Sequence, residues 1–308
     1  MNRRLLPFLI VFLTLGILAV PFGLNSVLSA HSGNSRQRAD GPCTPASGTI
    51  AIDTTWPLCT NVTGNVIVSP GVSLTIPPGG TVYFNADTIL RIEGKLIASG
   101  YPTATITFTS NLIPANPGDW DYIYFTPMSL NNPGCDTSGS WLKHVIVEYA
   151  GGAVIADNGA IRVQSASPCI ENSIIRYNSA DAIHAWSSSV PHDVSPVIQN
   201  NQIINNGTGM AQASGIYLRS SGLTQSVLIS SNQIEANTNT GIIIDVSTNA
   251  FITLQQNTIR NNTATSSSGG GIYLNARSSN IFQNTIVNNS TTLNGGGIFF
   301  AIGPQNNV

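Results

Sequence analysis

Side chains suited to binding or acid–base chemistry recur in this sequence at fixed places within short apolar segments, each of which follows a small residue. If alternate residues of each segment face outward, as in a β-strand, two rows of side chains reach solvent. The first row is His184, Tyr217, Ile243, Tyr273 and Phe299, and the second is Trp186, Arg219, Asp245, Asn275 and Ala301. One more segment, around Ile161 and Val163, adds Arg162 to the first row and Gln164 to the second.

Three explanations fit so many rings on a surface otherwise rich in Ser and Asn. Loops such as 187–195 or 206–214 would fold over the rows and bury them. Alternatively, the rows would contact another domain or chain as an exposed apolar patch. In the third explanation the rings stack on sugar faces while polar side chains bind hydroxyl groups. The candidates for that role are Arg162, His184, Trp186, Tyr217, Arg219, Asp245, Tyr273 and Asn275.

Catalysis on a polysaccharide would need further groups. A glycoside hydrolase uses two carboxyl groups roughly 5–10 Å apart, and a uronate lyase uses a basic residue. The candidates are Asp181, His184, Arg219 and Asp245, with Arg162 as a further base. Asp245 is expected between Arg219 and Asn275, so it has no carboxylate partner there. Asp181 would meet Asp193 only through loops.

No other motif adds chemistry. Asp119 and Asp121 form the one close acidic pair in the sequence, and we interpret them as turn residues. The four histidines and four cysteines show no metal-ligand spacing. The sequence therefore predicts no metal site and no cofactor, with Ca²⁺ expected only if the protein is a lyase.

A repeated Asn-x-Ile-x-x-Asn pattern spaces the apolar segments. Its copies begin at Asn201, Asn232, Asn257 and Asn284, with a fainter one at Ser173, and successive Ile residues lie 28, 31, 25 and 27 residues apart. Repeats of this length built from short apolar runs indicate a solenoid. Each period holds three such runs, which predicts one strand on each of three faces. The next coil would then pair in parallel about 4.8 Å away.

Equivalent residues of successive coils should stack on one another. Ile203, Ile234, Ile259 and Ile286 are expected to form an aliphatic stack inside the coil. Asn206, Asn237, Asn262 and Asn289 are expected to form a ladder of side-chain amides at a bend, outside that stack. We therefore interpret the repeated Asn as structural and not as ligands for calcium or sugar.

Several segments occur in an order that is typical of one fold. They are Gly64–Val68, Pro70–Gly79, Ile106–Ser110, Gly118–Trp120 and Val145–Gly151, followed by Ser195–Asn201 and Gly269–Ile272. This succession, over about residues 48–308, resembles secreted bacterial right-handed parallel β-helix proteins of the pectin-lyase-like superfamily. The resemblance implies an all-β, single-stranded right-handed parallel β-helix with an irregular N-terminal capping region. It does not choose a function, because the superfamily includes lyases, hydrolases, adhesins and passenger domains.

The chain is expected to have four parts. Residues 1–30 carry Arg3 and Arg4 before an apolar run, which is typical of a signal peptide or, alternatively, of an uncleaved membrane anchor. Residues 31–47 are expected to be a linker, and 48–150 an N-terminal cap with irregular first coils. Within that part, 111–140 is expected to leave the coil as one long excursion. Residues 151–308 are expected to be regular coils, with further coils or a domain beyond them.

The four cysteines fit an exported protein, because disulfides form in oxidising compartments. Cys43, Cys59, Cys135 and Cys169 are expected to form two disulfides, and the three possible pairings stay open. A Cys43–Cys59 bond would staple the start of the domain, and a Cys135–Cys169 bond would tie the excursion to the first regular coil.

The low charge content of the chain argues against two classes of binding partner. Only 8% of residues are charged and the net charge is −2, which gives no electrostatic basis for binding nucleic acid or an anionic membrane. We expect a secreted or cell-surface protein whose partner is a polysaccharide or cell-surface glycan. The leading hypothesis is a non-catalytic binding, adhesion or display scaffold. The alternative is a polysaccharide lyase or glycoside hydrolase of the same superfamily.

Overall fold

The fold was obtained as a computed structural model. It describes residues 43–187, 194–208, 213–220, 227–246, 251–276 and 278–301, together with the backbone of residues 36 and 37. The expected signal segment, 1–30, lies outside the described residues. Within them, no helix has the length and apolar character needed to cross a membrane.

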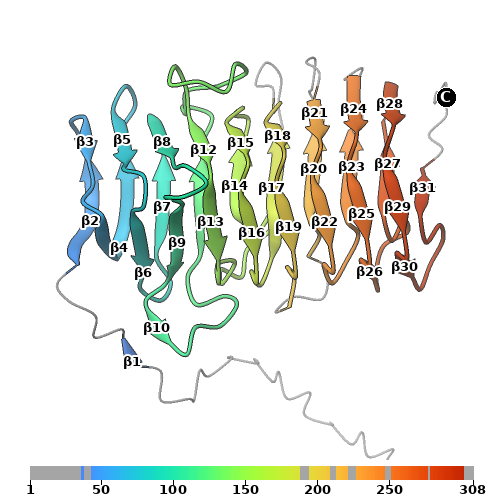
Figure 1. The fold of residues 1–308 in the computed structure, drawn as a ribbon, viewed down its shortest axis with the longest axis horizontal. Coiled ribbons are helices and arrows are strands. Elements are labelled where there is room, and N and C mark those ends of the chain that lie inside the picture. Colours follow the sequence, from blue (N-terminus) through green and yellow to red (C-terminus); the bar gives the residue numbers. More distant parts are fainter. Residues whose placement is uncertain are drawn as a thin grey trace, which may run out of the picture. The chain divides into compact units, whose positions relative to one another are not determined.

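Short strands wind into coils that stack along one axis, from β2 (Thr44–Ile50) to β31 (Ile298–Phe300) (Figure 1). Each complete coil contributes one strand to each of three parallel ladders, which form three faces of the helix. The chain visits face 1, face 2 and face 3 in turn, as β17, β18 and β19 do before β20 returns to face 1. β2 begins within the segment 31–47 that was expected to be a linker.

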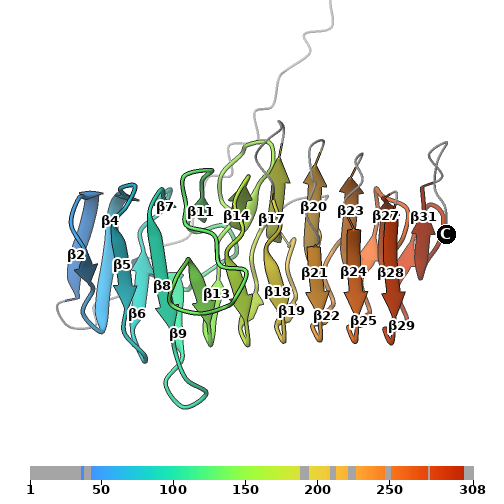
Figure 2. The same cartoon turned by 90° about the horizontal axis from the view of Figure 1, so that it is seen from above.

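Face 1 carries the two outward rows. Its strands, side by side in Figure 2, are β7 (Ile89–Ile92), β11 (Tyr122–Phe125), β14 (Gly159–Gln164), β17 (Asp181–Ser187), β20 (Ile216–Ser220), β23 (Ile242–Val246), β27 (Ile272–Asn275) and β31.

Faces 2 and 3 complete the coil. Face 2 contains β3 (Thr54–Thr55), β5 (Ser73–Ile76), β8 (Lys95–Ser99), β12 (Trp141–Lys143), β15 (Cys169–Glu171), β18 (Val197–Gln199), β21 (Val227–Ser230), β24 (Phe251–Gln255) and β28 (Ser278–Phe282). Face 3 contains β6 (Thr81–Phe84), β9 (Ile106–Ser110), β13 (Val145–Glu148), β16 (Ile174–Arg176), β19 (Gln202–Ile204), β22 (Gln233–Glu235), β25 (Thr258–Arg260) and β29 (Thr285–Val287). The long strands β2 and β4 (Cys59–Val68) run from face 3 onto face 1.

Alternation fills the inside of the helix with aliphatic and aromatic side chains. In β7, for example, Leu90 and Ile92 are fully buried while Arg91 faces outward. The predicted stack of Ile203, Ile234 and Ile259 is fully buried, and Ile286 is partly buried in the last described coil. Because equivalent residues repeat, one continuous core runs through the coils.

Two ladders of asparagine hold the bends on either side of face 3. In the expected ladder, Nδ2 of Asn206 donates to Oδ1 of Asn237 at 3.0 Å, and Asn237 and Asn262 each donate to the next coil at 2.9 Å. A second ladder, not expected from the sequence, joins Asn201, Asn232, Asn257 and Asn284. The amides of both ladders lie buried inside the coil apart from the partly buried last rung, so the expectation that they lie outside the aliphatic stack was wrong.

The residue before each asparagine turns the chain. Asn200, Ser231, Asn205 and Ala236, for example, have φ between 54° and 56°, in the left-handed region. This conformation bends the chain at the end of a strand within one residue, and the asparagine that follows is buried. Steric crowding explains why small residues precede the strands of face 1. A Cβ on Gly241, for example, would lie 2.8 Å from the Gly271 carbonyl oxygen and from Ile259 Cγ2.

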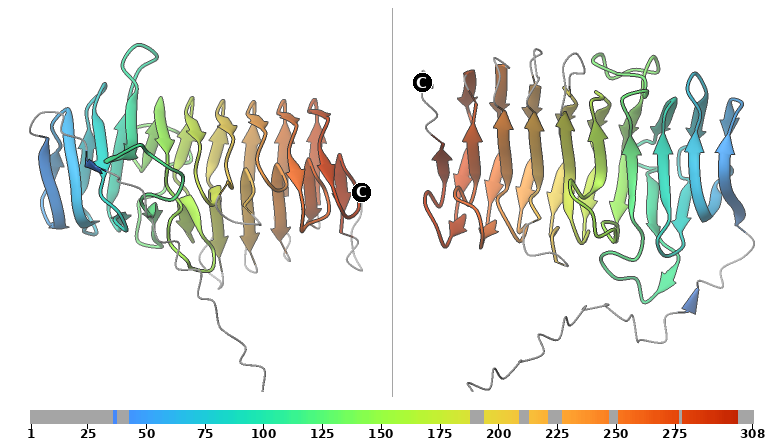
Figure 3. Two further views of the ribbon diagram at one scale, coloured as in Figure 1. Left: turned by 90° about the horizontal axis from the view of Figure 1, so that it is seen from below. Right: turned by 180° about the vertical axis from the view of Figure 1, so that it is seen from behind.

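Residues 111–140 do not form one excursion, because β11 lies in their middle and pairs with β7 and β14. The first excursion, 111–121, holds β10 (Leu112–Ile113), which projects from the stack and pairs with β1 (Arg36–Gln37) (Figure 3). Trp120 anchors it, since its ring is fully buried and stacks on Phe84 at 3.9 Å. The second excursion, 126–140, is tied to β15 by the disulfide Cys135–Cys169.

The other disulfide joins Cys43 to Cys59, at the start of the first coil. Both bonds are therefore among the pairings left open by the sequence. Two short segments, β26 (Thr263–Ala264) and β30 (Ser290–Thr291), also pair in parallel at the bend between faces 3 and 1.

Candidate functional site

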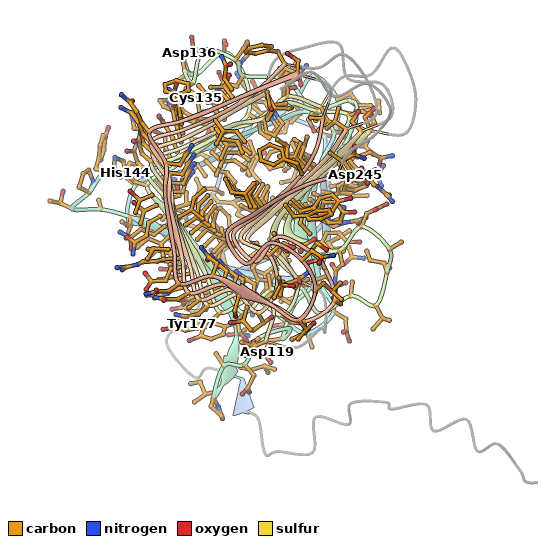
Figure 4. All side chains as sticks on the ribbon, turned by 90° about the vertical axis from the view of Figure 1, so that its right-hand side faces the viewer. Asp119, Cys135, Asp136, His144, Tyr177 and Asp245 are labelled. Carbon is orange, nitrogen blue, oxygen red and sulfur yellow. A yellow bond between two sulfur atoms is a disulfide. The ribbon has the colours of Figure 1, made fainter. Side chains whose placement is uncertain are left out.

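Face 1 brings the predicted candidates together in register. Arg162, His184, Tyr217, Ile243, Tyr273 and Phe299 pair in one continuous outward row, and Gln164, Trp186, Arg219, Asp245 and Asn275 in the next. Figure 4, viewed along the stack, shows Asp245 on the opposite side of the helix from His144. The chemistry-bearing side chains thus share one surface although they come from five coils.

A histidine held between two carboxylates lies at the centre of this surface. Nδ1 of His184 is 2.6 Å from Oδ2 of Asp181, and Nε2 is 3.3 Å from Oδ1 of Asp157. The second contact is an ion pair without aligned hydrogen-bond geometry, since Nε2 has no hydrogen-bond partner. The other oxygen of Asp181 accepts the backbone N–H of Ser214, so the next coil fixes this carboxylate.

The charges of the three groups depend on one another. Burial by itself lowers the pKa of His184, but its contacts with Asp157 and Asp181 outweigh burial and raise it overall. The contact with His184 holds the pKa of Asp157 below its usual value against burial, and Arg219 adds to the effect. Burial raises the pKa of Asp181. The contacts with Asp157 and Asp181 therefore favour the protonated imidazolium form of His184 over the neutral ring.

Arg162 is enclosed by three aromatic rings. Its guanidinium carbon lies 4.6, 4.9 and 4.8 Å from the ring centres of Tyr122, Tyr124 and Trp186, and the Tyr124 and Trp186 rings are nearly parallel. Nε of Arg162 donates to the carbonyl oxygen of Asp157 at 2.8 Å. Arg162 is 8% exposed and Trp186 is 7% exposed. Because both are buried, they support the neighbouring residues of the site and are poorly placed to contact a ligand.

The accessible part of the surface lies over β20, β23 and β27. Tyr217 and Tyr273 are partly buried and Arg219 is exposed. Beside them, Nδ2 of Asn275 donates to Oδ1 of Asp245 at 2.8 Å. We call the five residues Tyr217, Arg219, Asp245, Tyr273 and Asn275 the open surface.

A pocket of about 220 Å³ adjoins the open surface at Tyr217. Its lining is Ile155, Asp157, Asn158, Ala180, Asp181, His184, Ala213 and Tyr217. The pocket therefore joins the charged cluster to the row of rings. Of the loops expected to cover the rows, 188–193 and 209–212 lie outside the described residues, as does Asp193.

Two acidic residues of this region were not predicted to belong to the site, because Asp157 was not considered and Asp121 was interpreted as a turn residue. Asp157 belongs to the loop before β14, and Nη2 of Arg219 reaches it across two coils. Asp121 lies at the start of β11, where burial and the neighbouring Asp87 raise its pKa to about 6, opposed by Arg162. The residue of β14 that pairs with Asp181 is Gly159, so the register of the coils gave no signal for Asp157. By contrast, the side chain of Asp119 accepts hydrogen bonds from Ser110 and Asn116, as expected for a turn residue.

The carboxylates of the site do not suit Ca²⁺. Calcium needs six to eight oxygen ligands, whereas Asp157 and Asp181 are engaged by His184, Arg219 and Ser214. Among the described residues, the one group of three potential metal ligands is Cys135, Cys169 and Glu171. Its cysteines form a disulfide, so they offer no thiolate to a metal.

The coils and their outward rows define a right-handed β-helix protein of the general pectin-lyase-like type. The family model for a right handed beta helix region matches residues 135–308, more than half of the chain, and the chain belongs to this family. No curated protein and no solved structure gives a significant match.

Proposed function

We propose that this protein is an exported β-helix that binds a glycan on the open surface, as a recognition or adhesion scaffold. The observation that carries the proposal is the pairing of two rows on β20, β23 and β27. One row offers aromatic rings and the other a guanidinium, a carboxylate and an amide. Rings that stack on sugar faces beside groups that bind hydroxyls are the usual means of carbohydrate recognition.

The spacing of the rings supports an extended ligand. Tyr217 and Tyr273 are separated by the coil of Ile243, so they lie about 10 Å apart at the usual strand separation. This is close to the length of a disaccharide unit. Phe299 continues the row, with its ring stacked against Tyr273 at 5.7 Å. A linear polysaccharide lying along the helix axis would therefore meet the Tyr217 and Tyr273 rings about two sugars apart.

The pocket beside Tyr217 favours a second candidate function, acid–base catalysis at His184. Its lining includes the His184 imidazole and the carboxyl groups of Asp157 and Asp181. In hydrolysis, however, the sugar lies between the two carboxyl groups, and here the imidazole occupies that place. We therefore infer that His184, Asp157 and Asp181 position the residues of the open surface. Asp157 pairs with Arg219, and the His184 ring lies 4.8 Å from the Tyr217 ring.

One assay separates the two functions. The purified protein is run in native gels containing acidic or neutral polysaccharides, and the same mixtures are assayed for new reducing ends and unsaturated-uronate absorbance. Binding predicts retarded migration in at least one gel without product. Product that disappears in an Asp181→Asn or His184→Gln variant would establish the catalytic candidate instead.

A further inference from the structure

A second, larger pocket lies on face 3, away from the open surface. Its volume is about 410 Å³, and it is lined by Thr81, Tyr83, Thr107, Thr109, Ser110, Leu112, Ile113, Ala115, Glu148 and Tyr149. The strands β6, β9 and β13 form its floor, and residues 110–115 at the start of the first excursion form its wall. We call it the face 3 pocket.

The sheet fixes the polar groups of the floor. Thr81 pairs with Thr107 and Tyr83 pairs with Thr109, while Val82 and Phe108 between them point into the core. Within the described part of the chain, no hydrogen bond engages the hydroxyl groups of Thr81 and Thr107. These two hydroxyls are therefore free to bind a ligand without breaking a contact in the protein.

The wall is held by buried groups and needs no ligand to form. Oγ of Ser110 donates to Asp119 at 2.6 Å, and the backbone N–H of Asn116 donates to the same carboxylate at 2.9 Å. The indole N–H of Trp120 donates to the carbonyl oxygen of Glu148 at 2.9 Å, joining the excursion to the floor. A pocket that exists before binding loses little conformational entropy when it is filled.

The charge and the rings of the face 3 pocket indicate the class of ligand. Its one carboxylate, Glu148, is paired with Arg176 at 2.9 Å and accepts the Thr109 hydroxyl at 3.0 Å. An anionic ligand would meet that carboxylate, so the charge favours a neutral one. Tyr83 and Tyr149 supply aromatic surface, and the Tyr149 ring is backed by Tyr177 at 6.3 Å.

We propose that the face 3 pocket is a second carbohydrate site, which binds a neutral sugar ring through the Thr81 and Thr107 hydroxyls. Hydroxyl groups that both donate and accept hydrogen bonds match the hydroxyls of a sugar. The two sites lie on different faces, so this proposal does not depend on a ligand at the open surface.

Isothermal titration with neutral and acidic trisaccharides tests the proposal. The neutral probes are β-1,4-linked glucose, mannose, galactose and N-acetylglucosamine trisaccharides, and trigalacturonate is the acidic one. We expect at least one neutral probe to bind with a dissociation constant of the order of 1 mM. Thr81→Val with Thr107→Val should weaken this binding at least about tenfold, the loss of roughly one hydrogen bond to each hydroxyl.

Two control variants place the binding. Thr258→Val changes the same outward row of face 3 far from the pocket and should leave the affinity unchanged. Tyr217→Ala with Tyr273→Ala should also leave it unchanged, because those residues belong to the open surface. The single valine variants replace the double one if it does not fold. Absence of binding by every neutral probe, tighter binding of trigalacturonate in the pocket, or full binding by the threonine variants would overturn the proposal.

Discussion

Nδ1 of His184 lies 2.6 Å from Oδ2 of Asp181, and both side chains are almost completely buried. The other imidazole nitrogen faces Asp157, which in turn holds Arg219. One buried charge network therefore connects the interior of face 1 to an exposed residue of the open surface.

This network should make stability depend on pH. Because the folded protein raises the pKa of His184, the stabilisation by its proton is full below about pH 6.5, the ordinary histidine value. It is lost as pH rises through the folded value. We expect His184→Gln to lower the free energy of unfolding by about 2 kcal/mol or more at pH 5.5, and by less at pH 9. Denaturant unfolding at both pH values measures the difference, with His144→Asn as the control. An equal loss at both would contradict the assignment of a charged imidazole.

Asp121 should respond to pH in the opposite way. Burial raises its pKa to about 6, so ionising this carboxyl costs the folded state free energy that grows as pH rises from about 4 to 6. Asp121→Asn removes that cost. The side chain is partly exposed, and solvent screening reduces the gain. We expect the Tm to rise by about 2 °C at pH 7.5 and to stay the same at pH 3.5, by calorimetry. A lower Tm at pH 7.5 would show that the carboxylate stabilises the fold through Arg162.

The buried ladders should carry much of the stability of the coils. Asn237 accepts two hydrogen bonds from Asn206 and donates to Ile203 O and to Asn262. Asn237→Ala leaves buried groups of both neighbouring coils unpaired and should cost about 2–4 kcal/mol. Asn280→Ala, at an exposed position of β28, is the control and should change stability by less than about 0.5 kcal/mol. Equal effects of the two substitutions in urea unfolding would contradict the structural role of the ladder.

The Cys135–Cys169 bond should stabilise the second excursion. It closes a loop with a sequence separation of 34 residues, for which the loss of unfolded-state entropy corresponds to at most about 4 kcal/mol. We expect Cys135→Ser with Cys169→Ser to lower the free energy of unfolding by up to that amount and to speed proteolysis within 126–140. Limited proteolysis followed by mass spectrometry locates the cuts. Cuts confined to other segments would show that the disulfide does not restrain this one.

Much of face 1 followed from the sequence because its coils repeat. Ile183, Ile216, Ile242 and Ile272 recur after small residues, and a period of two then assigns every neighbour to one side. The stacking of the Asn206 ladder followed from the same periodicity. The second ladder was missed, although Asn201 begins the same motif, because only the final asparagine was considered at a bend.

The charged residues around Arg162 and Asp157 and the face 3 pocket could not be predicted in this way, because irregular insertions interrupt the periodicity of the sequence. The excursion after β11 separates Tyr124 from Arg162, so the pairing of these residues leaves no regular period in the sequence. Asp157 lies in a loop outside the alternating strand, where spacing assigns no direction to its side chain. The face 3 pocket likewise arises where residues 110–115 leave the coil. Periodicity predicted the scaffold, whereas the insertions determined the charged cluster and both pockets.

The central claim is that the open surface binds a glycan through Tyr217 and Tyr273. The most direct test measures retardation in affinity gels for Tyr217→Ala with Tyr273→Ala, for wild type, and for Tyr101→Ala, an exposed ring at the turn after β8. Circular dichroism and the Tm establish that each variant is folded. We predict that wild type and Tyr101→Ala are retarded by the same polysaccharide without product, and that the double variant migrates as in a gel without polysaccharide. Undiminished retardation of the folded double variant would contradict the claim.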